Sequence, residues 1–107
     1  MDGEFVRVAR CSEVPERRSK LIHLEGEEIA LWRVNGKFYA INNVCPHQHF
    51  SKLHEGTLDG LYVTCPMHGW SFCLEDGHPK LGNGRSSVYR VRVEGGDILV
   101  EKPLQRW

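Results

Sequence analysis

Residues 28–41 have the sequence EIALWRVNGKFYAI, in which two apolar-rich stretches flank the pair Asn35-Gly36. An Asn-Gly pair in this setting favours a two-residue type I′ turn, because both central residues of that turn need a positive φ angle. The sequence therefore predicts a β-hairpin whose strands span Glu28–Val34 and Lys37–Ile41.

Further short strands are predicted on both sides of this hairpin. Residues 88–93 (VYRVRV) alternate apolar and mostly basic side chains, which is typical of a half-buried strand, and a Gly-Gly turn follows them. No apolar stripe with a period of 3.6 residues persists for three turns, so the predicted fold class is all-β. The remaining predicted strands are Phe5–Ala9, Leu21–Leu24, Leu61–Thr64, Trp70–Leu74 and Ile98–Glu101, the last of which forms a second hairpin with Val88–Val93.

Length and composition limit the organisation of the chain. With 107 residues and 40% hydrophobic content, it can form one modest core, so residues 1–107 are expected to be a single domain. Fourteen Lys and Arg residues balance 14 Asp and Glu residues, which leaves no broad basic field for nucleic acid. No apolar stretch suits a secretion signal or a membrane span, and we expect a cytoplasmic protein without membrane or nucleic-acid partners.

The middle of the chain, residues 43–86, differs in composition from the strands around it. It contains every histidine except His23, three of the four cysteines and several Gly-containing turn pairs. We therefore expect a loop-rich insert over about 43–86. Within it stand two short motifs, Cys45-Pro46-His47 and Cys65-Pro66-Met67-His68.

Each motif supplies one thiolate and one imidazole, so Cys45, His47, Cys65 and His68 are the candidate metal ligands. Two sulfur and two nitrogen ligands suit either a tetrahedral zinc ion or a [2Fe-2S] cluster with cysteines on one iron and histidines on the other. Structural zinc sites generally use a wider Cys-x2–4-Cys or His-x3–5-His spacing within one motif. The spacing here therefore favours the cluster.

The pair Cys-x-His and Cys-x2-His resembles the two ligand motifs of Rieske-type iron–sulfur proteins. Several further segments are similar to the soluble Rieske ferredoxins, so the resemblance covers the chain from about Phe5 to Glu101. It implies a Rieske-type β-sandwich base, an inserted cluster-binding subdomain at about 43–86 and one [2Fe-2S] cluster per chain. The segments are Glu55–Gly60, Trp70-Ser71-Phe72, Tyr89-x-Val91 and Gly96–Val100.

Two departures from the membrane-bound, high-potential Rieske proteins bear on the expected chemistry. Those proteins carry an additional cysteine in each motif, and the two form a disulfide, whereas this chain has Phe50 and Met67 there. They also have a Ser and a Tyr after the second motif, where this chain has Trp70 and Phe72. Hydroxyl groups that donate to cluster sulfurs raise the potential, so we expect a low-potential carrier near about −150 mV.

The remaining cysteines and histidines are expected to have no ligand role. Cys11 and Cys73 are predicted to be structural thiols without a disulfide, at the first turn and in a strand, respectively. His49 is interpreted as a solvent-side neighbour of the cluster. His23, His54 and His78 are interpreted as surface or turn histidines. The apolar Phe50, Met67 and Trp70 either shield the cluster or simply pack the loops, with the edges of His47 and His68 exposed as an electron port.

The resemblance implies a soluble one-electron carrier, a Rieske ferredoxin, between a flavin-dependent reductase and a terminal oxygenase. Such a carrier is not itself an enzyme, and the sequence has no nucleophile–base, phosphate-loop or paired-carboxylate motif. A second hypothesis is the small Rieske-like subunit of an assimilatory nitrite reductase with its large subunit as partner, because residues 47–50 (HQHF) depart from the run common after the first ligand. A third is a zinc-stapled interaction module.

Overall fold

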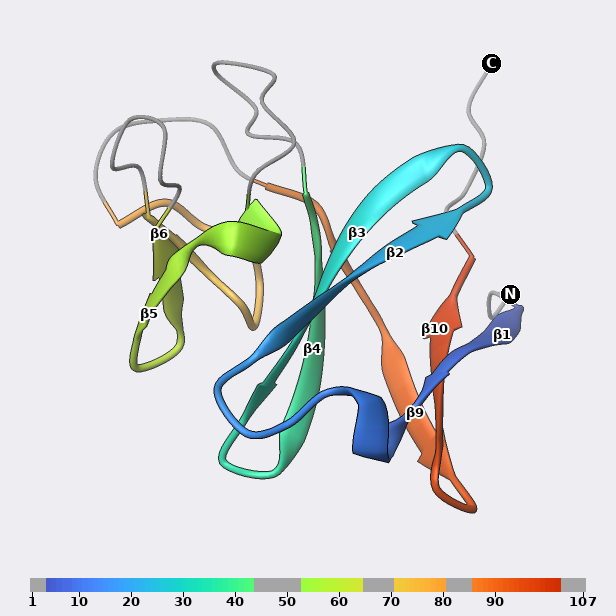
Figure 1. Cartoon of the computed structure of the whole chain (residues 1–107). Coiled ribbons are helices and arrows are strands. Elements are labelled where there is room, and N and C mark those ends of the chain that lie inside the picture. Colours follow the sequence, from blue (N-terminus) through green and yellow to red (C-terminus); the bar gives the residue numbers. More distant parts are fainter. Residues whose placement is uncertain (1–3, 44–52, 65–70, 81–85, 103–107) are drawn as a thin grey trace.

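The computed structural model describes residues 4–43, 53–64, 71–80 and 86–102. These residues form ten β-strands and two short 3-10 helices (Figure 1). No α-helix occurs in these four segments, which confirms the predicted all-β class. The elements are β1 (Phe5–Arg10), η1 (Cys11–Glu13), β2 (Ser19–Leu24), β3 (Glu27–Val34), β4 (Lys37–Asn42), η2 (Leu53–Glu55), β5 (Thr57–Asp59), β6 (Tyr62–Thr64), β7 (Ser71–Cys73), β8 (Val88–Tyr89), β9 (Val91–Glu94) and β10 (Asp97–Glu101).

The strands form three antiparallel sheets. Their orders are β1-β10-β9, β2-β3-β4-β8 and β5-β6-β7. In Figure 1 the β2-β3-β4 strands lie between β1, β9 and β10 on one side and β5 and β6 on the other. The four-stranded sheet is therefore the central layer.

Strand β3 is buried on both of its faces, which explains why its sequence is a nearly continuous apolar run. Its side chains alternate between two separate core clusters because successive residues of a strand point to opposite faces. Ile29 and Leu31 pack with Ile98 of β10, whereas Ala30 and Trp32 belong to the cluster shared with β6 and β7. β3 thus contacts two neighbouring sheets. One is the β1-β10-β9 sheet, called the base sheet below, whose core with β3 is the base core, and the other is the small β5-β6-β7 sheet.

The β3–β4 hairpin confirms the prediction made from Asn35-Gly36. The φ angles of Asn35 and Gly36 are 54° and 78°, and Val34 pairs with Lys37 across the turn. The Glu16 carboxylate accepts hydrogen bonds from the backbone N–H groups of both turn residues, at 3.0 Å for Gly36. These bonds lower the pKa of Glu16, first through Gly36 and then through Asn35, with Arg33 and Arg17 adding to the shift.

The single strand predicted over Val88–Val93 is wrong in one respect, because the structure divides it at Arg90. Val88 and Tyr89 pair with β4 in the central sheet, while β9 pairs with β10 in the base sheet. The alternation of apolar and polar side chains continues through Arg90, so the sequence pattern does not reveal the change of partner. The chain passes from one layer to the next at this residue.

Strand β5 was not expected from the sequence as a separate element. It has three residues and a mostly exposed burial pattern, which is too short for a hydrophobic period to be recognised. The strands predicted over Leu61–Thr64 and Trp70–Leu74 are present as β6 and β7, each shorter than predicted. No helix in the described ranges is long and apolar enough to cross a membrane.

Candidate metal centre

The four predicted ligands, Cys45, His47, Cys65 and His68, lie outside the described residues. The same is true of His49, Phe50, Met67 and Trp70. What the structure does describe is where each ligand-bearing segment begins and ends. Residues 44–52 follow Asn43, the first residue after β4, and precede η2. Residues 65–70 lie between β6 and β7.

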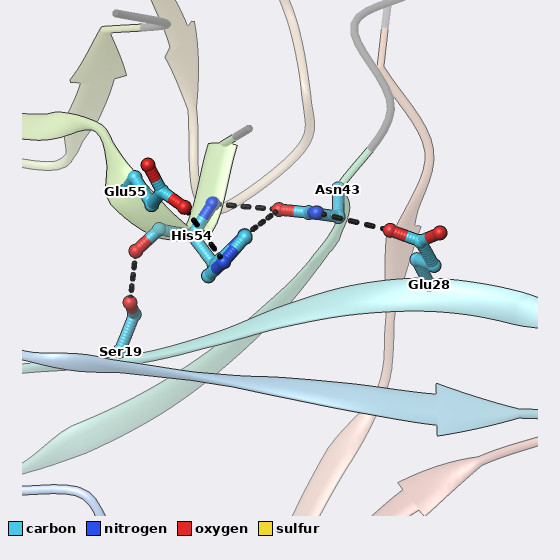
Figure 2. A network of polar contacts seen from close by, with 5 residues as sticks. All are labelled: Ser19, Glu28, Asn43, His54 and Glu55. Carbon is cyan, nitrogen blue, oxygen red and sulfur yellow. Dashed lines mark hydrogen bonds and ion pairs between the residues drawn. The ribbon is translucent and has the colours of Figure 1, made fainter. Parts of the chain in front are cut away.

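Asn43 and His54 join the two ends of the first segment (Figure 2). The Asn43 side-chain oxygen Oδ1 accepts the backbone N–H of His54 at 2.6 Å and lies 3.0 Å from His54 Nδ1. A backbone N–H can only donate, so this contact fixes the orientation of the amide, and Nδ1 carries a hydrogen toward the same oxygen. Asn43 itself is fully buried, with 0% of its surface exposed.

Both ends of this first segment are also attached to the central sheet. Asn43 donates its backbone N–H to the Glu28 carbonyl at 2.9 Å and its Nδ2 to Glu28 Oε1 at 3.3 Å. Ser19, at the start of β2, donates its hydroxyl to the backbone carbonyl of His54. On its other side the His54 ring lies 3.4 Å from the Glu55 carboxylate through Nε2. β2 and β3 thus fix where the first ligand segment starts and ends.

A second group of polar contacts holds the last residue of β4. Asn42 donates Nδ2 to the Tyr89 hydroxyl at 3.0 Å, and that hydroxyl donates to the Glu27 carboxylate. Burial, together with the hydrogen bond to Glu27, raises the pKa of Tyr89 well above its usual value, so the phenol remains a donor. The strand that leads into the first ligand motif is therefore fixed from both β3 and β8.

The second segment is closed at its root by a pair of hydroxyls. Thr64 and Ser71 are the last paired residues of β6 and β7, and they flank residues 65–70. Their side-chain oxygens, Oγ1 and Oγ, are 2.7 Å apart, within hydrogen-bond distance. The residues that flank each ligand-bearing segment are thus joined by a polar contact that involves a side chain.

The strands at which the two ligand segments begin and end, here called their roots, share one apolar core. Ile41 of β4, Val63 of β6 and Phe72 of β7 are all 0% exposed and belong to one cluster. Each of these residues stands within a few positions of a ligand motif. The fold therefore brings together the strands that flank the two segments, whose sequences carry two cysteines and two histidines. This donor set fits a mixed sulfur–nitrogen iron centre.

The position of Phe72 bears on the predicted low potential. Its ring is fully buried in the core between the central sheet and β6. At this position the sequence comparison with high-potential Rieske proteins expects a tyrosine hydroxyl, and this chain has none. Phe72 therefore contributes packing and offers no hydrogen-bond donor to a cluster.

Two of the three histidines interpreted as surface or turn residues have side-chain hydrogen-bond partners. His54 has only 22% of its side chain exposed and forms the contacts described above, so that interpretation is wrong for His54. His78 follows the turn after β7 and has 41% of its side chain exposed, as expected for a surface histidine. It also bonds Tyr62 Oη through Nε2 at 2.6 Å and Asp76 through Nδ1. His23 is exposed, as expected. No hydrophobic pattern could have shown these contacts, because they join residues that are distant in sequence or lie in turns.

Cys73, Asp76 and His78 place a thiol, a carboxylate and an imidazole within 4.8 Å of one another. Both ring nitrogens of His78 already have hydrogen-bond partners, so the group is best described as a hydrogen-bonded turn after β7. Cys73 is buried in that strand and Cys11 is half-buried against the base core, and both are free thiols. Their positions, in a strand and at the first turn, agree with the sequence prediction.

The all-β fold and the motifs Cys-x-His and Cys-x2-His together point to the class of iron–sulfur proteins. Residues 4–97 match the family model of the Rieske [2Fe-2S] domain. The chain belongs to this family, and its cofactor is a Rieske-type [2Fe-2S] cluster. The family assignment decides between the cluster and the zinc ion that the ligand types alone left open.

Similar proteins include ferredoxins of dioxygenase systems. The 3-phenylpropionate/cinnamic acid dioxygenase ferredoxin subunit of Shigella flexneri serotype 5b (strain 8401) is 41% identical over 91% of this chain and 94% of its own length. Among solved structures, a chain of the complex of reduced oxygenase and oxidized ferredoxin in carbazole 1,9a-dioxygenase is 32% identical, with a TM-score of 0.83. That match covers 94% of this chain and 97% of the other.

A likeness also exists to a protein of the second hypothesised class. The structure described as the NADH-dependent nitrite reductase small subunit of Mycobacterium tuberculosis has a TM-score of 0.88. The match covers 96% of this chain and 98% of that chain, but the sequences are only 22% identical. This comparison shows a common fold and nothing further about function.

Proposed function

We propose that this protein is a one-electron carrier that accepts an electron from a flavin-dependent reductase and passes it to a terminal, ring-hydroxylating oxygenase. The observation that carries the proposal is the 41% identity to a dioxygenase ferredoxin subunit over nearly the full length of both chains. A chain that corresponds to the ferredoxin component acts as a carrier and not as the oxygenase. It is therefore not itself an enzyme.

Four residues of this chain would hold the cluster. Cys45 and Cys65 would bind one iron and His47 and His68 the other, in keeping with the spacing of the two motifs and the ligation of Rieske centres. When bound, the cluster supplies one reversible electron. The protein's own contribution is to hold the two ligand segments at their roots, through Asn43 and His54 for the first and through Thr64 and Ser71 for the second.

The proposed carrier works at low potential and in the cytoplasm. Hydrogen bonds to cluster sulfurs stabilise the reduced state, and the buried ring of Phe72 provides none. Support for the compartment comes from the cysteines, because Cys11 and Cys73 are free thiols, and a reducing environment keeps thiols in that state.

The proposal can be tested with the purified iron-loaded protein, a flavin reductase and the oxygenase of a 3-phenylpropionate/cinnamic acid dioxygenase. Stopped-flow spectroscopy would follow reduction of the protein by the reductase and its reoxidation by the oxygenase. We expect both steps within seconds. His47→Ala should abolish the signal of the cluster, whereas His23→Ala, a change at an exposed histidine, should leave it intact.

Failure of the reduced protein to reoxidise with the oxygenase would contradict the proposed partner. Rapid reoxidation by the large subunit of an assimilatory nitrite reductase would then assign the chain to the second class, whose fold it shares. A wild-type protein that binds zinc and no iron would contradict the ligand assignment itself.

A further inference from the structure

We propose that Asn43 and His54 form a clasp that joins the two ends of the chain flanking the first ligand segment, and that Asn43 is a positioning residue for Cys45 and His47. The inference rests on the proposed function in one respect, namely that this segment supplies two of the four cluster ligands. Everything else in it depends on contacts among described residues (Figure 2).

The clasp joins the two ends of the segment through one atom. Asn43 precedes Cys45 by two positions, and His54 follows the segment in η2. Asn43 Oδ1 accepts the backbone N–H of His54 at 2.6 Å and faces Nδ1 of the same residue at 3.0 Å. A single side-chain oxygen therefore fixes the distance between the start and the end of the ligand-bearing segment.

The clasp is also attached to the rigid part of the molecule. Asn43 binds Glu28 twice, through its backbone N–H at 2.9 Å and through Nδ2 at 3.3 Å. The Ser19 hydroxyl donates to the carbonyl of His54. Glu28 belongs to β3 and Ser19 to β2. Other residues of these two strands are buried in the cores on the two sides of the central sheet. Separating Asn43 from His54 thus disturbs bonds to two strands.

The chemistry of position 43 supports a positioning role over simple packing. A fully buried amide is costly unless it is hydrogen-bonded, and an apolar residue would fill the same space without that cost. Asn43, directly after β4, uses its nitrogen for a contact with β3 and its oxygen for a contact with η2. Removal of the amide would leave the N–H of His54 and the carboxylate of Glu28 without this partner.

The test measures how fast the oxidised, cluster-loaded protein releases iron to a chelator at neutral pH, with the thermal midpoint recorded in parallel. We expect Asn43→Ala to release iron about tenfold faster than the wild type, the factor expected for the loss of a well-formed buried hydrogen bond. The control is Val100→Ala, a change in the base core on β10. It should lower the thermal midpoint without accelerating iron release.

A second pair of variants covers the case in which Asn43→Ala does not fold. Asn43→Asp preserves the shape but places a carboxylate against that of Glu28, and it should accelerate iron release and alter the EPR line shape. Asn43→Asp combined with Glu28→Gln restores one donor and one acceptor at this contact, and should return both properties toward the wild-type values. His54→Ala retains the backbone N–H and should have a smaller effect than Asn43→Ala.

Two results would overturn the clasp. One is an iron-release rate for Asn43→Ala equal to that of Val100→Ala. The other is an unchanged rate when Glu28→Gln is added to Asn43→Asp. A wild-type protein without a Rieske-type EPR signal would instead contradict the proposed function, so the two failures are distinguishable.

Discussion

At the scale of single residues, Glu16 shows how one exposed carboxylate stabilises a turn. Its oxygens accept the backbone N–H groups of Gly36 and Asn35, and these bonds hold its pKa below the usual value of 4.5. A carboxylate whose pKa is lowered by folding contributes stability above the unfolded-state pKa. That contribution is lost as the pH falls through the folded-state pKa.

We therefore expect Glu16→Gln to be less stable than the wild type at pH 7, with a difference that shrinks as the pH falls below about 4.5. Urea unfolding at a series of pH values would measure it. Glu13→Gln is a suitable control because Glu13 only forms an exposed pair with Lys20, at 3.7 Å, and such surface pairs contribute little. A Glu16→Gln difference that stays constant from pH 7 to pH 3 would refute this account.

The same scale shows which residues a sequence can identify. The four proposed ligands can be predicted from residue type and spacing, because Cys-x-His and Cys-x2-His are local patterns. Asn43 and His54 could not be found in this way, since their contacts depend on the positions of η2 and β3. An asparagine before a ligand motif and a histidine after it form no recognisable sequence motif, so their contact was visible only in the structure.

At the scale of elements, the turn after β7 is fixed by a very close backbone approach. Gly77 has a φ angle of 81°, its N–H donates to Cys73, and its carbonyl accepts the N–H of Ser86 at 2.9 Å. A Cβ atom at this position would lie 1.8 Å from the Ser86 carbonyl oxygen. Ser86 can therefore lie this close to position 77 only because glycine has no Cβ atom.

Gly77→Ala is expected to destabilise the protein by more than the cost of about 1–2 kcal/mol that a left-handed conformation imposes on alanine. The matched control is Gly60→Ala in the β5–β6 turn, where φ is 61° but a Cβ would meet no described atom within 4 Å. Gly60→Ala should lose only the conformational part. Equal losses of unfolding free energy for the two variants would show that the contact with Ser86 is not limiting.

Element boundaries were predictable where turn chemistry is strong and less so where strands change partners. Asn35-Gly36 located the central hairpin, because its conformation is dictated by two adjacent residues. The division of 88–93 into β8 and β9 depends instead on which sheet lies beside each half. Side chains alternate with a period of two residues in both sheets, so the sequence pattern does not show where β8 ends and β9 begins.

At the scale of the whole molecule, a two-sided central sheet connects a base to a small third sheet that leads into the ligand segments. One core cluster joins the central sheet to β1 and β10, and the other joins it to β6 and β7. The sequence predicted the all-β class and an insert rich in loops, but the sharing of β3 between two cores required the structure. The first ligand segment therefore starts from the central sheet and the second from the third sheet, and one core cluster joins the two sheets.

The central claim is that this chain carries one electron at low potential on a cluster held by Cys45, His47, Cys65 and His68. An EPR-monitored redox titration of the iron-loaded protein tests it most directly. We expect a Rieske-type signal on reduction, with a midpoint potential of about −150 mV. A midpoint near about +300 mV would contradict the inferred lack of hydroxyl donors to the cluster, and a colourless, EPR-silent protein would contradict the electron-transfer function.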